Sequence, residues 1–251
     1  MMPLTAKKRL AVLVAALSLL LLMATPSRVL GFLLPNTIQL GGFGGTLWQG
    51  QAARAYVTIG DKVIHLGRVS WELKPWSLLL FSPSIDLDAR WGQQRLTGNV
   101  RLPLGGGLTL RNIDAAVGVE TIRAFLPLYV GGALEAQLPV MRLESIQPPV
   151  IDRVEGRLIW RNGVWTARAG DVALGNYAME LTGEEGSLVG RLQTLSGPLE
   201  ANGQLTLEEQ HYRVALALRG PATANEGLRG SLRLMATPVA DGFDLTINGQ
   251  L

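Results

Sequence analysis

Apolar and polar residues alternate along most of the chain after residue 40. In the segment 84–90, every second residue from Ile85 to Ala89 is apolar, and the residues between them are acidic. The same period of two recurs in the segments 95–102, 211–219 and 243–248. Successive side chains of a strand point to opposite sides of a sheet. The pattern therefore predicts strands with one apolar and one solvated face, which is typical of antiparallel sheets.

The alternation also predicts which residues share a side of the sheet. The candidate apolar face consists of Leu87, Leu96, Val100, Val214, Leu216, Leu245 and Ile247. The opposite face is predicted to carry Asp86, Asp88, Arg95, Arg213 and Asp244. A slip of one residue would bury these charges, so the register has little freedom. The pattern leaves open whether a second layer covers the apolar face, the sheet closes on itself, or an apolar groove stays open.

The dipeptide Asn162-Gly163 is the clearest turn signal in the chain. Both residue types tolerate the positive φ of a type I′ turn, which joins two strands of a hairpin through two residues. Such a turn fixes the register on either side of it. We therefore predict a hairpin in which Trp160 lies opposite Trp165 on one face.

Helical patterns are scarce in the body of the chain. We predict a short helix in 120–126 and a helical turn that begins at Pro75. The segment 147–150 contains Pro148-Pro149, which interrupts strand pairing, and we place there a boundary between two halves. The halves are weakly similar, either through an old duplication or, as we favour, because strand starts have similar sequences. The predicted fold class is mainly β: an N-terminal transmembrane helix, then a long, curved, mostly antiparallel sheet, half-barrel or sandwich-like, with one or two short helices.

The N-terminus has the features of a membrane signal. Lys7, Lys8 and Arg9 precede an apolar run over 10–23, and such a basic cluster stays in the cytoplasm. The run alone suits a cleaved signal peptide, whereas its continuation to residue 34 is long enough to span a bilayer. Because a good cleavage site is missing, we interpret 1–34 as a cytoplasmic stub and an uncleaved anchor, with a signal peptide as the alternative. Residues 35–251 then form a β-rich domain in the periplasm.

Composition excludes several kinds of chemistry. The 251 residues include no Cys and only two His, which argues against Cys-ligated metals, thiol nucleophiles and His-rich metal sites. The net charge of +3 arises from cations that precede residue 35, so the body is almost neutral and lacks the basic footprint of a nucleic-acid-binding protein. No nucleophile elbow, zinc-protease motif or phosphate-binding loop is present. We therefore expect no enzyme activity, no cofactor and no metal.

A series of short motifs resembles a known family over nearly the whole chain. The motifs are Gly-Thr-Leu-Trp-x-Gly at 45–50, the Trp-Glu-Leu-Lys-Pro-Trp run at 71–76, Gly-Pro-Leu at 197–199 and the closing segment 241–251. Their order is similar to that of the type II secretion system protein N family, which is itself distantly similar to AsmA-like proteins. The residues that carry the resemblance are Gly45, Thr46, Leu47, Trp48, Gly50, Trp71, Pro75, Gly197, Pro198, Leu199, Asp241, Gly242 and Gly249.

The resemblance implies a function without transferring any catalytic residue. It implies a single-pass inner-membrane protein of Gram-negative bacteria, with its N-terminus in the cytoplasm and its main domain in the periplasm. Its partners would be the inner membrane and other type II secretion components, either the inner-membrane platform or the secretin. It would support export of folded proteins across the outer membrane. The alternative is that the protein binds lipid or another hydrophobic ligand in an AsmA-like β groove.

Overall fold

The structure of the protein is a computed structural model of the whole chain. The structure describes residues 13–14, 17–18, 20–60, 62–122, 130–146, 149–167, 170–208 and 210–250. The basic cluster that is predicted to orient the N-terminus, Lys7, Lys8 and Arg9, lies outside these residues. So does part of the predicted anchor.

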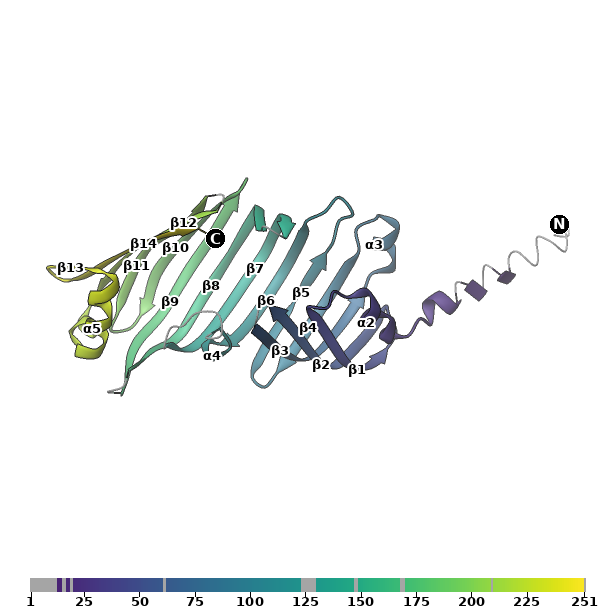
Figure 1. Cartoon of the computed structure of the whole chain (residues 1–251), viewed down its shortest axis with the longest axis horizontal. Coiled ribbons are helices and arrows are strands. Elements are labelled where there is room, and N and C mark those ends of the chain that lie inside the picture. Colours follow the sequence, from purple (N-terminus) through teal and green to yellow (C-terminus); the bar gives the residue numbers. More distant parts are fainter. Residues whose placement is uncertain are drawn as a thin grey trace.

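One antiparallel sheet forms nearly all of the described protein (Figure 1). The strands are β1 Ile38–Gly45, β2 Gln49–Ile59, β3 Lys62–Leu73, β4 Ser84–Trp91, β5 Gln94–Arg101, β6 Leu108–Gly118, β7 Val130–Ile146, β8 Pro149–Ala167, β9 Gly170–Glu184, β10 Ser187–Ser196, β11 Glu200–Glu208, β12 His211–Arg219, β13 Thr237–Val239 and β14 Gly242–Gln250. They follow one another across the 14-stranded sheet in chain order, except that β14 lies between β12 and β13. Each alternating segment of the sequence is thus a strand, as predicted, and the sheet is an open single layer with β1 and β13 at its edges.

Short helices lie at the ends and rims of this sheet (Figure 1). They are η1 Ser27–Val29, α2 Leu30–Leu33, α3 Pro75–Leu79, α4 Val119–Ile122, η2 Pro221–Ala224 and α5 Glu226–Met235. The predicted helical turn from Pro75 is confirmed as α3, with the proline in the first turn. Of the helix predicted over 120–126, α4 covers the start, and residues 123–126 lie outside the described part. The alternating pattern did not predict α5.

The predicted hairpin at Asn162-Gly163 is wrong. Both residues lie inside β8, which runs on to Ala167. Asn162 does adopt a positive φ of 50°, but here it creates a β-bulge, and the pairing with β9 shifts between Trp160 and Gly163. The two tryptophans pair with β9 instead of each other. In a regular strand, Trp160 and Trp165 would point to opposite faces. The extra residue of the bulge shifts the alternation by one, so both indoles pack against the same apolar cluster.

The point predicted to divide two halves lies between two paired strands. Residues 147 and 148 are outside the described part, and Ile146 of β7 pairs with Pro149 of β8 beside them. The sheet therefore continues across this point. Two similar halves stay a prediction.

Buried apolar residues form two separate clusters at opposite ends of the sheet. The cluster near the N-terminal end joins β2, β3 and β4 through Ala55, Val69 and Ala89. The larger one near the C-terminal end includes Tyr177, Leu228 and Phe243, and α5 covers it. No helix within the described residues combines the length and apolarity needed to cross a membrane, so the single-pass anchor stays a prediction.

Candidate functional site: an apolar face closed at its two ends

The register brings the candidate apolar residues to one side of the sheet. At the N-terminal end, Leu87 lies opposite Trp71, and the next strand places Leu96 and Val100 opposite apolar residues of β4. At the C-terminal end, Val214 pairs with Ile247, and Leu216 pairs with Leu245. The predicted charged residues alternate with these and fall on the other side: Asp86, Asp88, Arg95, Arg213 and Asp244.

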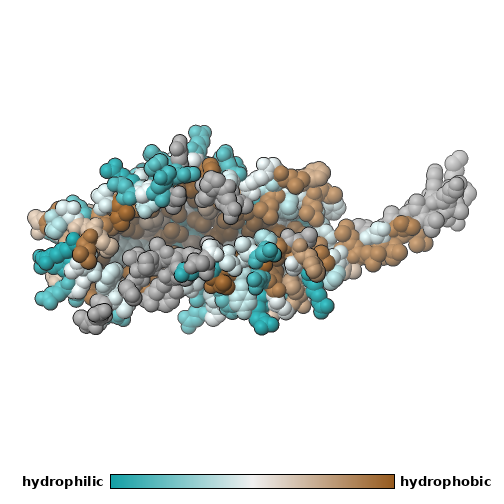
Figure 2. Space-filling model, in the orientation of Figure 1, coloured by the Kyte–Doolittle hydropathy of each residue, from teal (hydrophilic) through white to brown (hydrophobic). Residues whose placement is uncertain are grey.

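The same face continues through the middle of the sheet. Leu134 of β7 pairs with Trp160 of β8, and Leu158 pairs with Met179 of β9. All four of these side chains are only partly buried, because no second layer of described residues covers them. Figure 2 shows this side hollowed along the long axis, with hydrophobic residues inside the hollow and hydrophilic residues along its rims. The result is an apolar groove that is open along its middle.

The first end of the groove is closed by the N-terminal segment. Trp48 Nε1 donates a hydrogen bond to the carbonyl of Leu22 at 2.9 Å. Next to it, the Leu47 N–H donates to the carbonyl of Thr25 at 2.8 Å, and Ser27 is buried where the segment meets the sheet. Motif residues between β1 and β2 thus bind the chain that precedes the sheet.

The loop that makes these contacts is itself held from both sides. The Gln49 N–H donates to Thr46 Oγ1 at 3.1 Å, which ties the loop to its own base. Trp71 Nε1 donates to the Leu47 carbonyl at 3.0 Å, and its ring lies where any Cβ on Gly50 would stand. The glycine of the motif is therefore required for the close approach of the indole.

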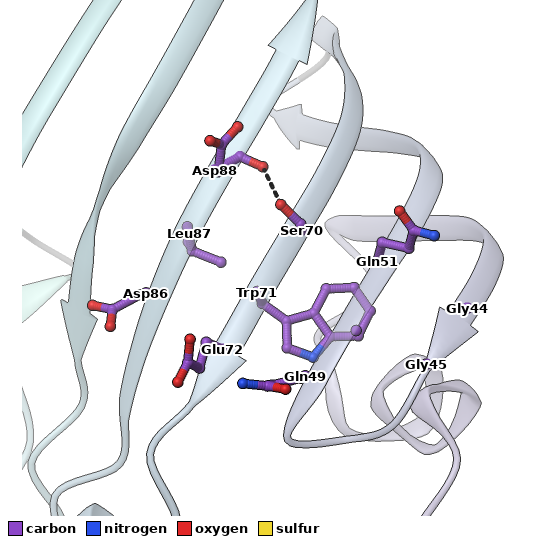
Figure 3. Close-up of a pocket in the computed structure, with 11 residues that line it drawn as sticks. Gly44, Gly45, Gln49, Gln51, Ser70, Trp71, Glu72, Asp86, Leu87 and Asp88 are labelled. Carbon is purple, nitrogen blue, oxygen red and sulfur yellow. Dashed lines mark hydrogen bonds between the residues drawn. The ribbon is translucent and has the colours of Figure 1, made fainter.

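A shallow pocket of about 490 Å³ lies beside this loop, across β1 to β4 (Figure 3). Its lining includes Gly45, Trp71 and the carboxylates of Glu72, Asp86 and Asp88. The Lys74 ammonium forms an ion pair with the Asp86 carboxylate at 2.8 Å. This contact and a hydrogen bond from Asn99 lower the pKa of Asp86, although partial burial acts in the opposite direction. A carboxylate that stays ionised and is neutralised by Lys74 is not suited to general acid catalysis near neutral pH.

At the second end, the motif Gly197-Pro198-Leu199 lies between β10 and β11 against the larger cluster. The buried Tyr177 hydroxyl lies 3.0 Å from the Leu174 carbonyl and 2.8 Å from the Leu199 carbonyl. The Pro198 carbonyl accepts a hydrogen bond from Ala222 N–H at 3.0 Å. The loop is thus joined both to the sheet and to η2, which leads into α5.

Two of the motif glycines, Gly197 and Gly249, allow neighbouring segments to approach closely at this end. Gly197 has a φ of 135° and faces Gly175 so closely that a Cβ would strike the backbone. Gly249 lies under the ring of Tyr212 in the neighbouring strand. In both places a side chain would push neighbouring strands apart.

The remaining motif residues close the last hairpin. Asp241 forms an ion pair with Arg219 at 3.0 Å just before β14, and Gly242 pairs with Arg219 across the sheet. Arg219 also bonds Asp244 at 2.8 Å, and these partners raise the pKa of its guanidinium. The motif residues therefore gather in two groups, one at each end of the groove, and not in a single site.

Tyr177 is the residue of this site that the sequence analysis missed. Burial raises the pKa of Tyr177 to about 12 from 10.0. At a pH between these two pKa values, the Tyr177 hydroxyl has lost its proton in the unfolded chain and keeps it in the folded chain. Stability therefore falls as the pH rises through this window. We expect a loss of about 2–3 kcal/mol from this group, complete above pH 12.

The variant Tyr177→Phe isolates this effect. It leaves two carbonyls without their donor and is expected to cost about 1–3 kcal/mol at pH 7. In urea unfolding at a series of pH values, the difference between parent and variant should shrink from pH 10 and vanish above 12. A constant difference over that range would contradict the assignment.

Among the residues that the structure describes, no group of acidic or histidine side chains has the arrangement of a metal site. The charged side chains of the polar face form exposed ion pairs across neighbouring strands, such as Arg95 with Asp114 and Arg161 with Glu135. Exposed pairs of this kind contribute little to stability. The distinctive surface is the groove.

These features define a class: a one-layer antiparallel β protein whose apolar face is closed only at its ends. Residues 36–246 match the family described as type II secretion system (T2SS), protein N, and the chain belongs to that family. It is 29 % identical over 225 residues to type II secretion system protein N of Aeromonas hydrophila, covering 86 % of each chain. It is 28 % identical over 230 residues to the protein of that name in Vibrio cholerae serotype O1, covering 87 % of each. No solved structure matches the chain.

Proposed function

We propose that the protein is a non-enzymatic, inner-membrane-anchored component of the type II secretion system, with its sheet in the periplasm. In this role it supports export of folded proteins across the outer membrane. Membership of the T2SS protein N family supports a place in this system. The observation that carries the anchored arrangement is the hydrogen bond between Trp48 and Leu22, which fastens the apolar N-terminal segment to the sheet.

In this arrangement, the contacts at this end would set the direction in which the segment 22–26 leaves the sheet. Pro26 and Thr46 form a bridge beside the end of β1, and Leu47 and Trp48 bind the segment on its N-terminal side. A body attached in this way follows the anchor as one unit, whereas a flexible linker would let it rotate freely. Partners would then meet the same surface of the sheet at a fixed height above the membrane.

A secretion assay tests this role. In a bacterium whose own copy is deleted, the full chain should restore release of a folded substrate enzyme into the medium. Trp48→Ala should restore less at equal protein level, and Trp48→Phe, which removes the donor but keeps a ring, should fall between them. A periplasmic reporter fused after residue 251 should be active, and the mature protein should keep its first residues. If the deletion strain released as much of the substrate enzyme without the protein as with it, the role would be refuted.

A second candidate function is binding of lipid or another hydrophobic ligand in the groove. One observation favours it: the apolar face is continuous across the sheet, yet its middle residues are only partly buried. Exposed apolar surface of this extent is rare on proteins that have no apolar partner. Acyl chains would lie along the groove and replace water there.

Neighbouring residues of β9 provide a matched test of the groove. Leu181 lies on the apolar face and is partly buried, whereas Thr182 lies on the polar face and is exposed. Leu181→Asn is expected to keep the fold, at a loss of about 1–2 kcal/mol, and to reduce uptake of a fluorescent fatty acid. Thr182→Asn should take up the probe as the parent does. Equal uptake by both variants would exclude the groove as the binding site.

A further inference from the structure

A cluster of large apolar side chains projects from one rim of the sheet. It is formed by α3, the two residues after it and the loop between β5 and β6, and we call it the apolar tip. Its members and their exposed fractions are Trp76 77 %, Leu79 69 %, Leu80 78 %, Phe81 68 % and Leu104 73 %. None of them belongs to either buried cluster. In Figure 2 hydrophobic residues cover the place of α3, at the end of the molecule from which the N-terminal segment leaves.

Backbone hydrogen bonds hold the two parts of the tip together. The Leu104 N–H donates to the Phe81 carbonyl at 3.0 Å, and the Leu102 N–H donates to the Pro83 carbonyl at 2.9 Å. At the end of α3, the N–H groups of Phe81 and Ser82 return to carbonyls of the helix, at Leu78 and Ser77. The tip is therefore a built feature, and its side chains are held outward.

Phe81 occupies a position where glycine is the usual residue. It follows the end of α3 with a φ of 54°, in the left-handed conformation that closes many helices. A bulky residue is unfavourable in this conformation, and the exposed ring gains no burial that would offset it. An apolar environment outside the protein would offset this unfavourable conformation by burying the ring.

Two arginines lie directly behind the tip. Arg101 and Arg111 line both of the hollows on this rim, one of about 540 Å³ and one of about 580 Å³. The second hollow is also lined by Trp76 and Leu80. The Arg101 Nε atom is buried and has no hydrogen-bond partner, and neither guanidinium has an acidic partner among the described side chains.

The acidic groups on the walls do not cancel this charge. Asp86 is neutralised by Lys74 at 2.8 Å, and Arg142 pairs with Asp152 at 3.1 Å. Glu72 and Glu144 complete the acidic lining, and both are exposed to water. The rim therefore offers two unpaired guanidinium groups beside a projecting apolar tip.

We propose that this rim binds the surface of a lipid bilayer. The tip enters the boundary between headgroups and acyl chains, and Arg101 and Arg111 bind the phosphates of anionic lipids. Trp, Phe and Leu next to cations form the usual pattern of a segment that lies in a membrane interface. A protein partner fits less well, because the tip is a narrow projection and stable protein interfaces need a broad complementary surface. The inference concerns the rim alone and holds whether or not the N-terminal segment crosses the membrane.

A single fluorescent label tests the proposal, because the chain contains no Cys. An environment-sensitive dye is attached to Leu80→Cys in the full chain, which is then mixed with vesicles of phosphatidylcholine and phosphatidylglycerol. The matched control is Leu234→Cys, an equally apolar and exposed position on α5 at the far end of the sheet. We expect a blue shift and quenching by spin-labelled lipids at position 80, and neither at position 234. Water-like emission at position 80, or equal quenching at both positions, would overturn the proposal.

Charge variants test the role of the two arginines. Arg101→Gln together with Arg111→Gln should lower the ratio of inserted to free tips by about fivefold for each charge removed, and only on vesicles that contain phosphatidylglycerol. Arg213→Gln together with Arg229→Gln, at the other end of the sheet, should leave the ratio unchanged. An equal effect of both pairs, or an equal effect on vesicles of phosphatidylcholine alone, would overturn the headgroup assignment.

Phe81→Gly separates membrane contact from a structural role. Glycine suits the positive φ at this position, so we expect a higher urea midpoint together with weaker lipid quenching at position 80. If the ring instead supports the fold, the midpoint should fall, and this would count against the proposal. Quenching that stays equal to the parent's would do so as well.

Discussion

Trp71→Ala is expected to lower the free energy of unfolding by about 3–5 kcal/mol. The indole is 6 % exposed, packs edge-on against Phe43 at a centroid distance of 6.5 Å, and fills the space over Gly50. Its removal leaves a cavity between β2 and β3 and deprives the Leu47 carbonyl of its donor. Because Leu47 in turn binds Thr25, the N-terminal segment should also become more sensitive to protease. Urea unfolding of the full chain in mild detergent, followed by circular dichroism, measures the first effect.

Two further variants separate packing from hydrogen bonding at Trp71. Trp71→Phe keeps most of the ring volume and loses only the N–H, so we expect a smaller loss of about 1–2 kcal/mol. Gly50→Ala should destabilise the parent, because its Cβ would collide with the indole. In the Trp71→Ala background the clash of this methyl group with the indole is gone, and only its clash with the Thr46 carbonyl oxygen remains. The double variant should therefore lose less stability than the sum of the two single losses. If the two losses of stability were strictly additive, the contact between Gly50 and Trp71 would not be the cause of the loss in Gly50→Ala.

The strands were predictable because one local rule specifies them. The alternation in 84–90 and 211–219 places every charge on one side, and the register of β4 and β12 keeps it there. Burying an unpaired charge is far more unfavourable than the loss of any single strand contact, so alternative registers are excluded by the sequence alone. The alternation does not predict what covers the apolar side, because the cover is formed by segments that are distant in the chain.

Asn162-Gly163 shows how a correct local signal led to a wrong element. The dipeptide indicates a positive φ, and Asn162 has one. A positive φ serves a type I′ turn and a β-bulge equally well, and the choice depends on the length of the neighbouring strands. Here β7 and β9 both extend past this point, so continuing the pairing satisfies more backbone groups than a turn would.

The candidate site was only half visible in the sequence. The motif residues were found, but their division between the two ends of a groove follows from the strand order and has no local signature. Tyr177 lacked any signal, since an aromatic residue in an alternating strand is ordinary. Its hydroxyl bonds the carbonyl of Leu174 within β9 and that of Leu199 in the distant loop between β10 and β11. The helix α5 did carry a signal: Asn225 caps it through Gly227 and Leu228. Glycines at 227 and 230 weaken its helical propensity, so packing of Leu228 and Leu232 on the sheet stabilises it.

That packing makes Leu228→Asp the change with the largest expected effect at the C-terminal end. Leu228 is 2 % exposed and lies in the cluster with Tyr177 and Phe243. The variant loses the buried leucine, worth about 2–5 kcal/mol, and in addition places a carboxylate among apolar side chains. We expect α5 to detach from the sheet, exposing the cluster, and the whole C-terminal end to unfold at lower urea concentration.

The same helix provides the control for this prediction. Leu234 is 87 % exposed, so Leu234→Asp adds the same charge to α5 without burying it and should change stability by less than about 0.5 kcal/mol. Binding of a dye that reports exposed apolar surface should rise for Leu228→Asp and stay at the parent level for Leu234→Asp. This difference between the two variants arises only if α5 closes the groove through Leu228 and Leu232. If both variants unfold alike, α5 does not cover the cluster in solution, and the groove is open at this end as well as along its middle.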